Sequence, residues 1–133
     1  MIYTLVGLFK GDKFSYGRAL VSPKYLPSFA SMRIGYELNC REKLEKAFTV
    51  EIPHIGKVLV DAICTVESAI ISNGFIERSA VFHLVDEPFL RKLECDVILG
   101  LDTIIWWGLI VDEVNGKVYS TIAKRFPTIN IYR

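Results

Sequence analysis

Three segments near the C-terminus decide the fold, and they read Asp96-Val97-Ile98-Leu99-Gly100-Leu101-Asp102, Gly108-Leu109-Ile110-Val111-Asp112 and Asn115-Gly116-Lys117-Val118-Tyr119. The first is an apolar strand that ends in a glycine, which allows close backbone approach where a strand turns into a helix. Asp102 is a candidate N-cap for a short helix over residues 103–107, which Gly108 would end. Asn115-Gly116 then predicts a β-hairpin, because both residues tolerate positive φ.

Upstream of these segments the chain reads as further strands separated by turns. Residues 2–9 and 14–21 predict an opening hairpin, and Asn73-Gly74 predicts another. Residues 57–67 alternate between apolar and polar side chains, which predicts a strand with one buried and one wet face. Because strands far outweigh helices and no strand–helix–strand alternation is visible, we predict an all-β fold with one or two short helices.

Two segments differ from this pattern. Residues 22–31 contain two prolines and several small side chains, and we expect a loop there. Residues 41–46 carry charge pairs at helical spacing, which favours a helix of at most two turns. A strand over residues 48–52 follows, with its turn at residues 53–56.

The composition predicts a single domain over residues 1–133. Hydrophobic residues make up 51% of the chain and charged residues 23%, which is too apolar for a disordered tail and sufficient for a buried core. Sixteen basic against fifteen acidic side chains give no electrostatic reason to bind nucleic acid or an anionic membrane. The longest apolar run, residues 104–111, is well short of the roughly 20 residues that span a bilayer.

The expected cellular compartment bears on the oxidation state of the three cysteines. Residues 1–4 lack the basic segment of a signal peptide, so we expect a cytoplasmic protein. Glutamine is absent and isoleucine is abundant, which is compatible with a heat-adapted source. Cys40, Cys64 and Cys95 form no Cys-x-x-Cys pair, so we expect reduced thiols, with Cys64 and Cys95 in the core, and neither a metal nor another cofactor.

The three C-terminal segments resemble the end of the retropepsin-like (retroviral-type) aspartic proteases. In that family an apolar strand ends in Ile-Leu-Gly, a short helix follows, and a Gly-Lys hairpin closes the domain. The strand, turn and strand around Gly56 resemble the family's flap, and residues 75–85 resemble the strand before the closing motif. The resemblance implies a closed retropepsin-like barrel that forms half of a symmetric homodimer.

The resemblance also implies that the catalytic Asp-Thr-Gly-Ala motif follows an Ala-Leu-Val strand. Here Ala19-Leu20-Val21 is followed by Ser22-Pro23-Lys24-Tyr25, and Ser28-Phe29-Ala30-Ser31 matches the Ser-Phe-Ile-Ser that commonly trails the motif. Aspartic proteases need two carboxylates that share one proton, and a serine hydroxyl cannot ionise in that role. This member is therefore degenerate, and Ser22 stands where the catalytic aspartate would be.

The resemblance assigns a binding cleft rather than a catalytic site to these residues. The cleft would consist of the degenerate motif and the flap turn, namely Ser22, Pro23, Lys24, Tyr25, His54, Ile55 and Gly56. A second register, Leu59-Val60-Asp61-Ala62-Ile63-Cys64, keeps an aspartate. Only 39 positions separate Asp61 from Gly100, which leaves too little chain for the flap and the later strands, and an exposed acidic residue on a strand is the simpler interpretation.

Other candidate residues lack a supporting pattern. His54 and His83 have no motif partner, and the acidic residues between positions 86 and 113 match no nuclease signature. Trp106 and Trp107 fit a core or interface position better than a ligand contact.

Two functions follow from these observations. The first is a non-catalytic, homodimeric module that binds an extended peptide or protein by strand addition, without nucleic acid or membrane partners. The alternative is a divergent aspartic endopeptidase that uses Asp61.

Overall fold

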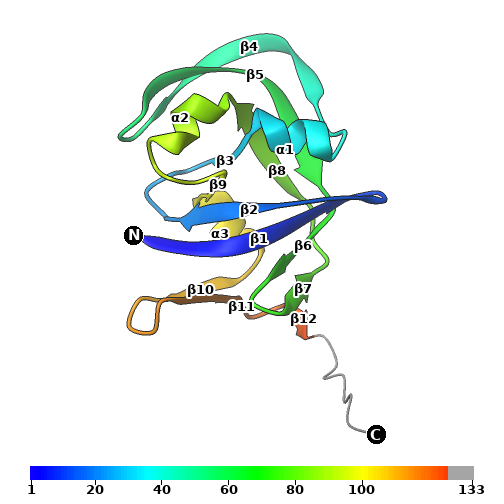
Figure 1. The fold of residues 1–133 in the computed structure, drawn as a ribbon, viewed down its shortest axis with the longest axis vertical. Coiled ribbons are helices and arrows are strands. Elements are labelled where there is room, and N and C mark those ends of the chain that lie inside the picture. The colour runs from blue at the N-terminus through cyan, green and yellow to red at the C-terminus, as the bar shows by residue number, and fades with distance from the viewer. Residues whose placement is uncertain (126–133) are drawn as a thin grey trace, which may run out of the picture.

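The computed structural model describes residues 1–125, and β-strands dominate it (Figure 1). The strands are β1 (Ile2–Lys10), β2 (Lys13–Val21), β3 (Ser28–Ser31), β4 (Glu42–Ile52), β5 (Gly56–Val66), β6 (Ser68–Ile71), β7 (Gly74–Ile76), β8 (Ala80–Val85), β9 (Val97–Leu99), β10 (Leu109–Asp112), β11 (Lys117–Ser120) and β12 (Lys124–Arg125). The helices are α1 (Met32–Glu37), α2 (Glu87–Arg91) and α3 (Leu101–Trp106). The all-β prediction is confirmed, although these residues contain three short helices. Residues 126–133 of the predicted 1–133 domain lie outside the described residues.

One large sheet carries most of the structure. Its strand order is β12-β7-β6-β1-β2-β9-β3-β8-β5-β4, and β10 and β11 form a separate hairpin. Most neighbours are antiparallel, whereas β2–β9 and β3–β8 are parallel. Between residues 1 and 125 the outer strands β12 and β4 do not pair with each other, so the predicted closed barrel is wrong. The sheet curls around its core and ends at β4, whose exposed, charged side chains protect an open edge.

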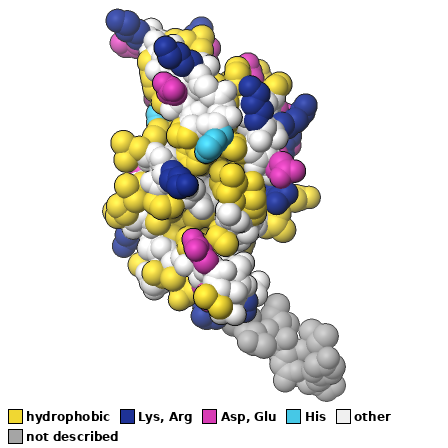
Figure 2. Space-filling view, turned by 90° about the vertical axis from the view of Figure 1, so that its left-hand side faces the viewer, with side chains coloured by type: hydrophobic (Ala, Val, Ile, Leu, Met, Phe, Trp, Pro, Cys, Tyr) yellow, Lys and Arg dark blue, Asp and Glu magenta, His cyan; other side chains and the backbone are white. Residues whose placement is uncertain are grey.

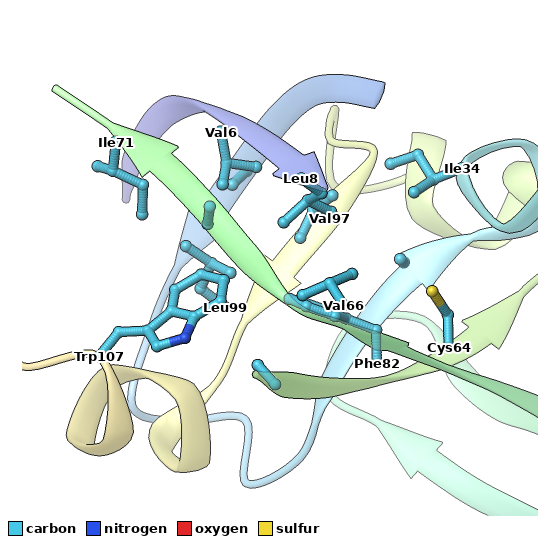
Figure 3. Packing of buried hydrophobic residues seen from close by; sticks show 14 of the residues in the cluster. Val6, Leu8, Ile34, Cys64, Val66, Ile71, Phe82, Val97, Leu99 and Trp107 are labelled. Atoms are coloured by element: carbon cyan, nitrogen blue, oxygen red, sulfur yellow. The ribbon is translucent and has the colours of Figure 1, made fainter. Parts of the chain in front are cut away.

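Buried side chains form two clusters on opposite faces of the central strands. Alternate residues of β9 divide between them, with Leu99 in the larger cluster and Ile98 in the smaller. In the larger cluster the indole of Trp107 packs near Phe82, with ring centroids 6.1 Å apart (Figure 3). The smaller cluster lies beneath the β4–β5 hairpin and α2, and it includes Leu20, Tyr25, Phe29, Ile52, Val58, Val60, Leu90 and Cys95.

The apolar face of β5 is continuous, as its alternating pattern predicts. Its inward residues are all buried, and they are Val58, Val60, Ala62, Cys64 and Val66. The first two belong to the smaller cluster and the last three to the larger one. One long strand therefore joins both halves of the core, while Asp61 on its other face is exposed.

The predicted hairpins are confirmed, with one shift of position. The β1–β2 and β10–β11 hairpins form where expected. The β6–β7 turn consists of Ser72 and Asn73, with φ of 48° and 63°, rather than Asn73 and Gly74. Two successive positive φ angles match the right-handed twist of the flanking strands. The strand expected over residues 75–85 is divided into β7 and β8.

The helix predicted over residues 41–46 is wrong, because this segment belongs to β4. Its charge pairs favour a helix locally, but the strand pairs with β5 at Glu42, Lys43 and again from Phe48 to Ile52, which satisfies backbone groups on both sides of the irregularity. The register shifts between Lys43 and Phe48, which marks an irregularity in the strand. Tertiary pairing therefore overrides the local helix propensity.

The loop and helix boundaries near the decisive segments also need correction. The expected loop over residues 22–31 contains the buried strand β3, which lies between β8 and β9. The N-cap of α3 is Gly100 rather than Asp102, which lies in the first turn and accepts a hydrogen bond from Thr103 N (2.8 Å). No helix among residues 1–125 is long and apolar enough to cross a bilayer.

Cys40 and Cys64 form a disulfide, so the prediction of reduced thiols is wrong for this pair. Cys40 precedes β4 and Cys64 lies on β5, and strand pairing brings their Cα atoms to 5.1 Å across 24 positions of sequence. Spacing along the chain does not reveal such an approach. Cys95 is a free, buried thiol in the core, as predicted, and burial raises its pKa to about 11.

The disulfide predicts a measurable stabilisation. Replacing Cys40 and Cys64 together by alanine should lower the free energy of unfolding by about 3 kcal/mol, because the unfolded chain regains the entropy of the closed loop. Urea unfolding followed by circular dichroism measures this change. Reductant should weaken the wild type similarly and leave the double variant unaffected; equal stability of oxidised wild type and double variant would contradict the pairing.

Candidate binding cleft

The segment after β2 forms a tight turn, residues 22–25, called here the Ser22 turn. Ser22 N donates to Leu99 O (3.2 Å), which ties the turn to β9. Tyr25 N donates to Ser22 O (3.4 Å), and Lys24 N donates to Ser22 Oγ (3.3 Å). Pro23 has no N–H to donate. The Ser22 hydroxyl oxygen is therefore engaged as an acceptor within the turn.

The chain after the Ser22 turn lies directly against the start of α3. Leu101 N donates to Tyr25 O (2.7 Å), and Asp102 N donates to Leu26 O (3.2 Å). A Cβ atom on Gly100 would overlap with the carbonyl oxygens of Tyr25 and Pro27. The close backbone approach that the sequence predicts at Gly100 is thus confirmed, and any larger residue there would push the two segments apart.

A buried hydroxyl network reinforces this contact. Ser28 Oγ donates to Asp102 Oδ1 (2.7 Å), accepts from Gly100 N (2.9 Å), and lies 2.6 Å from Thr103 Oγ1. Ser28 and Thr103 are buried. A single serine therefore joins β3 to the first turn of α3, and an apolar residue in its place would take away the side-chain partner of Gly100 N and leave the buried Thr103 hydroxyl with only its longer contact to Asp102 (3.5 Å).

An apolar cavity of about 600 Å³ opens beside the Ser22 turn. It lies on the face that carries the N-terminus, where many hydrophobic side chains are exposed and charged side chains lie between and around them (Figure 2). Its walls come from β1, β2, the flap turn, α3 and the β10–β11 hairpin, through Met1, Ile2, Leu20, Val21, Ser22, Pro23, Lys24, Tyr25, His54, Ile104, Leu109, Ile110, Val111 and Glu113. Segments far apart in sequence therefore meet at one site.

The cavity contains most of the residues that the sequence predicts for a cleft. All four residues of the Ser22 turn and His54 line it. Ile55 instead packs, partly buried, against the smaller cluster, and Gly56 (φ 108°) is exposed at the start of β5. The walls from Ile2 and the β10–β11 hairpin were not anticipated, because only the tertiary fold brings them to the Ser22 turn.

The end of the β4–β5 hairpin, residues 48–60, is called here the flap, and it contacts the Ser22 turn. The Tyr25 hydroxyl donates to Pro53 O (3.2 Å). Burial raises the pKa of Tyr25, and nearby Cys95 and Tyr3 act in the same direction. The hydroxyl therefore keeps its proton at neutral pH and remains a donor to the flap.

Comparison with solved structures finds the same architecture. The retroviral protease-like domain of Ddi1 from Leishmania major is similar over 96% of this chain and 94% of that chain, with a TM-score of 0.64 and 12% sequence identity. The fold is retropepsin-like. No family model and no curated protein matches the sequence, so the retropepsin-like assignment rests on structure and describes the fold.

Within this retropepsin-like fold, the Ser22 turn supplies a hydroxyl and an ammonium group but no carboxylate. Among the cavity-lining residues that the structure describes, Glu113 is the one carboxylate, and it comes from the β10–β11 loop. Asp61 is exposed on β5 and lies outside the cavity lining. An acid pair needs two carboxylates close enough to share a proton. The cavity is therefore equipped for apolar contacts and hydrogen bonds.

The remaining candidate residues, His83, Trp106 and Trp107, contact the protein's own backbone. His83 Nδ1 lies 3.2 Å from Ser28 O, within the sheet. Trp107 is buried and Trp106 half-exposed, and both indole N–H groups donate to backbone carbonyls between β7 and β8. Residues 1–125 contain no group of three His, Cys, Asp or Glu side chains that could hold a metal ion.

Two buried serines of β3 provide a matched test of the network. Ser28→Ala should lower the free energy of unfolding by about 3 kcal/mol, because Gly100 N and Asp102 lose a buried partner. Ser31→Ala should leave stability unchanged or raise it, since Ser31 Oγ has no hydrogen-bond partner among the described residues. Urea unfolding of both variants measures the difference, and equal losses would contradict the role of Ser28.

Proposed function

We propose that this chain is a non-catalytic retropepsin-like module that acts as a homodimer and binds an extended peptide or protein segment. The observation that carries the proposal is the Ser22 turn. It occupies the position that the resemblance gives to the catalytic loop and borders an apolar cavity, while serine, proline and lysine replace the residues that hydrolysis requires.

The homodimer is supported by solvent-exposed hydrophobic side chains around the cavity. Met1 is 81% exposed, Val114 94% and Ile110 42%. Figure 2 shows hydrophobic side chains over much of the same face, with charged side chains between them. Apolar surface of this kind marks interaction sites on soluble proteins. A two-fold axis near the Ser22 turn would cover part of this face on both copies at once, with the cavities and the strand edges beside them left for a ligand.

Peptide binding is supported by open strand edges beside the cavity. One edge of β1 pairs with β2 along its whole length, whereas the other edge pairs with β6 only at residues 7–9 and leaves residues 2–6 open. β10 pairs with β11 on one edge. Among the described residues the opposite edges have no strand partner, and both strands line the cavity, through Ile2 and Ile110. An extended peptide can add to such an edge through backbone hydrogen bonds.

The disulfide and the composition support a proposal for the cellular compartment and the kind of source organism. Disulfides are rare in the cytoplasm of most cells, but they are frequent in intracellular proteins of hyperthermophiles. The absence of glutamine favours a heat-adapted source as well. We therefore place the module in the cytoplasm of a heat-adapted cell, where the Cys40–Cys64 bond can persist.

Incubation with a reduced and alkylated polypeptide tests the loss of catalysis. Between about pH 3 and pH 7 we expect no cleavage products on gels or by mass spectrometry, because no acid pair is available. Cleavage that disappears in Asp61→Ala would contradict the proposal and support the alternative, a divergent aspartic endopeptidase. The same polypeptide, fluorescently labelled, reports binding through its anisotropy.

Two lysine substitutions at similarly exposed positions make the binding measurement specific. Ile110→Lys places a charge in the cavity wall, and it should weaken binding about tenfold or more. Val81→Lys, at a position 40% exposed on β8 and outside the cavity, is the matched control and should leave binding unchanged. Equal effects of the two variants, or no binding by the wild type, would contradict the assignment of the cavity.

A further inference from the structure

The space beneath the flap is filled by the protein's own side chains. Ile52, Val58 and Val60 on the inward face of the flap are between 0 and 2% exposed. They pack in the smaller cluster with Phe29 and with Tyr25, which is 4% exposed. An extended ligand therefore has no room beneath the flap while this packing persists.

Tyr25 lies on the boundary between this filled space and the open cavity. Its ring belongs to the smaller cluster, and the same residue lines the cavity. Its backbone is held from the other side, because Tyr25 O accepts a hydrogen bond from Leu101 N (2.7 Å), where the chain passes close to Gly100. Movement at this boundary is therefore a movement of the Tyr25 side chain or of the flap above it.

The hydroxyl of Tyr25 also ties down the turn of the flap. It donates to Pro53 O (3.2 Å), whereas the hydrogen bond from Ile55 N to Ile52 O (3.0 Å) is internal to the turn. Pro53 and His54 are exposed, and no atom lies within 4 Å of a Cβ built on Gly56. Pro53, His54 and Gly56 thus have few packing contacts, and the bond from Tyr25 adds a polar tie to the packing of Ile52 and Ile55 on either side of them.

We propose that Tyr25 is the gate residue of the flap: its ring packs with the inward side chains of the flap in the space beneath it, its hydrogen bond to Pro53 O ties the turn of the flap to this packing, and a ligand enters that space only after this bond breaks. The cavity outside the gate stays accessible in the closed state. A ligand therefore contacts the cavity first and displaces the Tyr25 ring second. The gate is a property of the free chain and does not depend on which ligand the cavity binds.

Hydrogen exchange of the free full-length chain tests the gate without any ligand. Tyr25→Phe keeps the ring in the core and removes the hydroxyl. Loss of one hydrogen bond should accelerate amide exchange in the flap about threefold to tenfold, with little change in the β1–β2 hairpin. Tyr36→Phe is the matched control, because the exposed Tyr36 hydroxyl also takes part in a hydrogen bond, which it accepts from Arg41 Nη1 (2.9 Å) on α1's side of the molecule.

The outcomes separate the gate from a merely structural tyrosine. Acceleration confined to the flap in Tyr25→Phe, and absent in Tyr36→Phe, is the expected result. Unchanged flap exchange in Tyr25→Phe would overturn the gate, and so would an equal acceleration in the flap and the β1–β2 hairpin, which indicates a loss of global stability. Because no peptide is present, failure of polypeptide binding would count against the proposed function and leave this result untouched.

Discussion

The close approach of residues 25–27 to Gly100 is the constraint on which the rest of the structure depends. Because no side chain occupies that point, the first amides of α3 reach the carbonyls of Tyr25 and Leu26, and the hydroxyl of Ser28 bonds to Gly100 N and to the first turn of α3. These interactions set the Ser22 turn beside the cavity and direct the Tyr25 ring beneath the flap. The backbone contact between residues 25–27 and Gly100 thus positions the residues of the cavity.

The parts of the fold that local chemistry dictates could be predicted from the sequence. The alternation along β5 and the glycine between β9 and α3 each require a particular backbone, so the pattern and the structure agree there. The Asn-Gly pairs mark the two hairpins, although the β6–β7 turn lies one residue earlier than predicted. Residues 41–46 show the limit of this reasoning. Their charge pairs favour a helix, while the edge of β5, about 20 positions later in the sequence at these pairs, takes them as a strand. The disulfide escaped prediction for the same reason, since the pairing of β4 with β5 places Cys40 beside Cys64.

The candidate site divides in the same way. The Ser22 turn and His54 could be identified because they stand in a recognisable order relative to Gly100, and they line one cavity. The opposite wall could not, because nothing local in β10 indicates that it faces Ile2. Tyr25 could likewise be assigned to the cleft from the sequence, yet its contact with Pro53 depends on how the flap folds back.

A crystal structure of the purified protein tests most directly whether a retropepsin-like scaffold persists here without its acid pair. We expect a two-fold axis that passes close to Ser22 and Lys24, with hydroxyl groups facing each other where the family has carboxylates. A lattice in which the Ser22 turn is buried away from every two-fold axis would contradict this, as would two Asp61 carboxylates facing each other across a shared cleft.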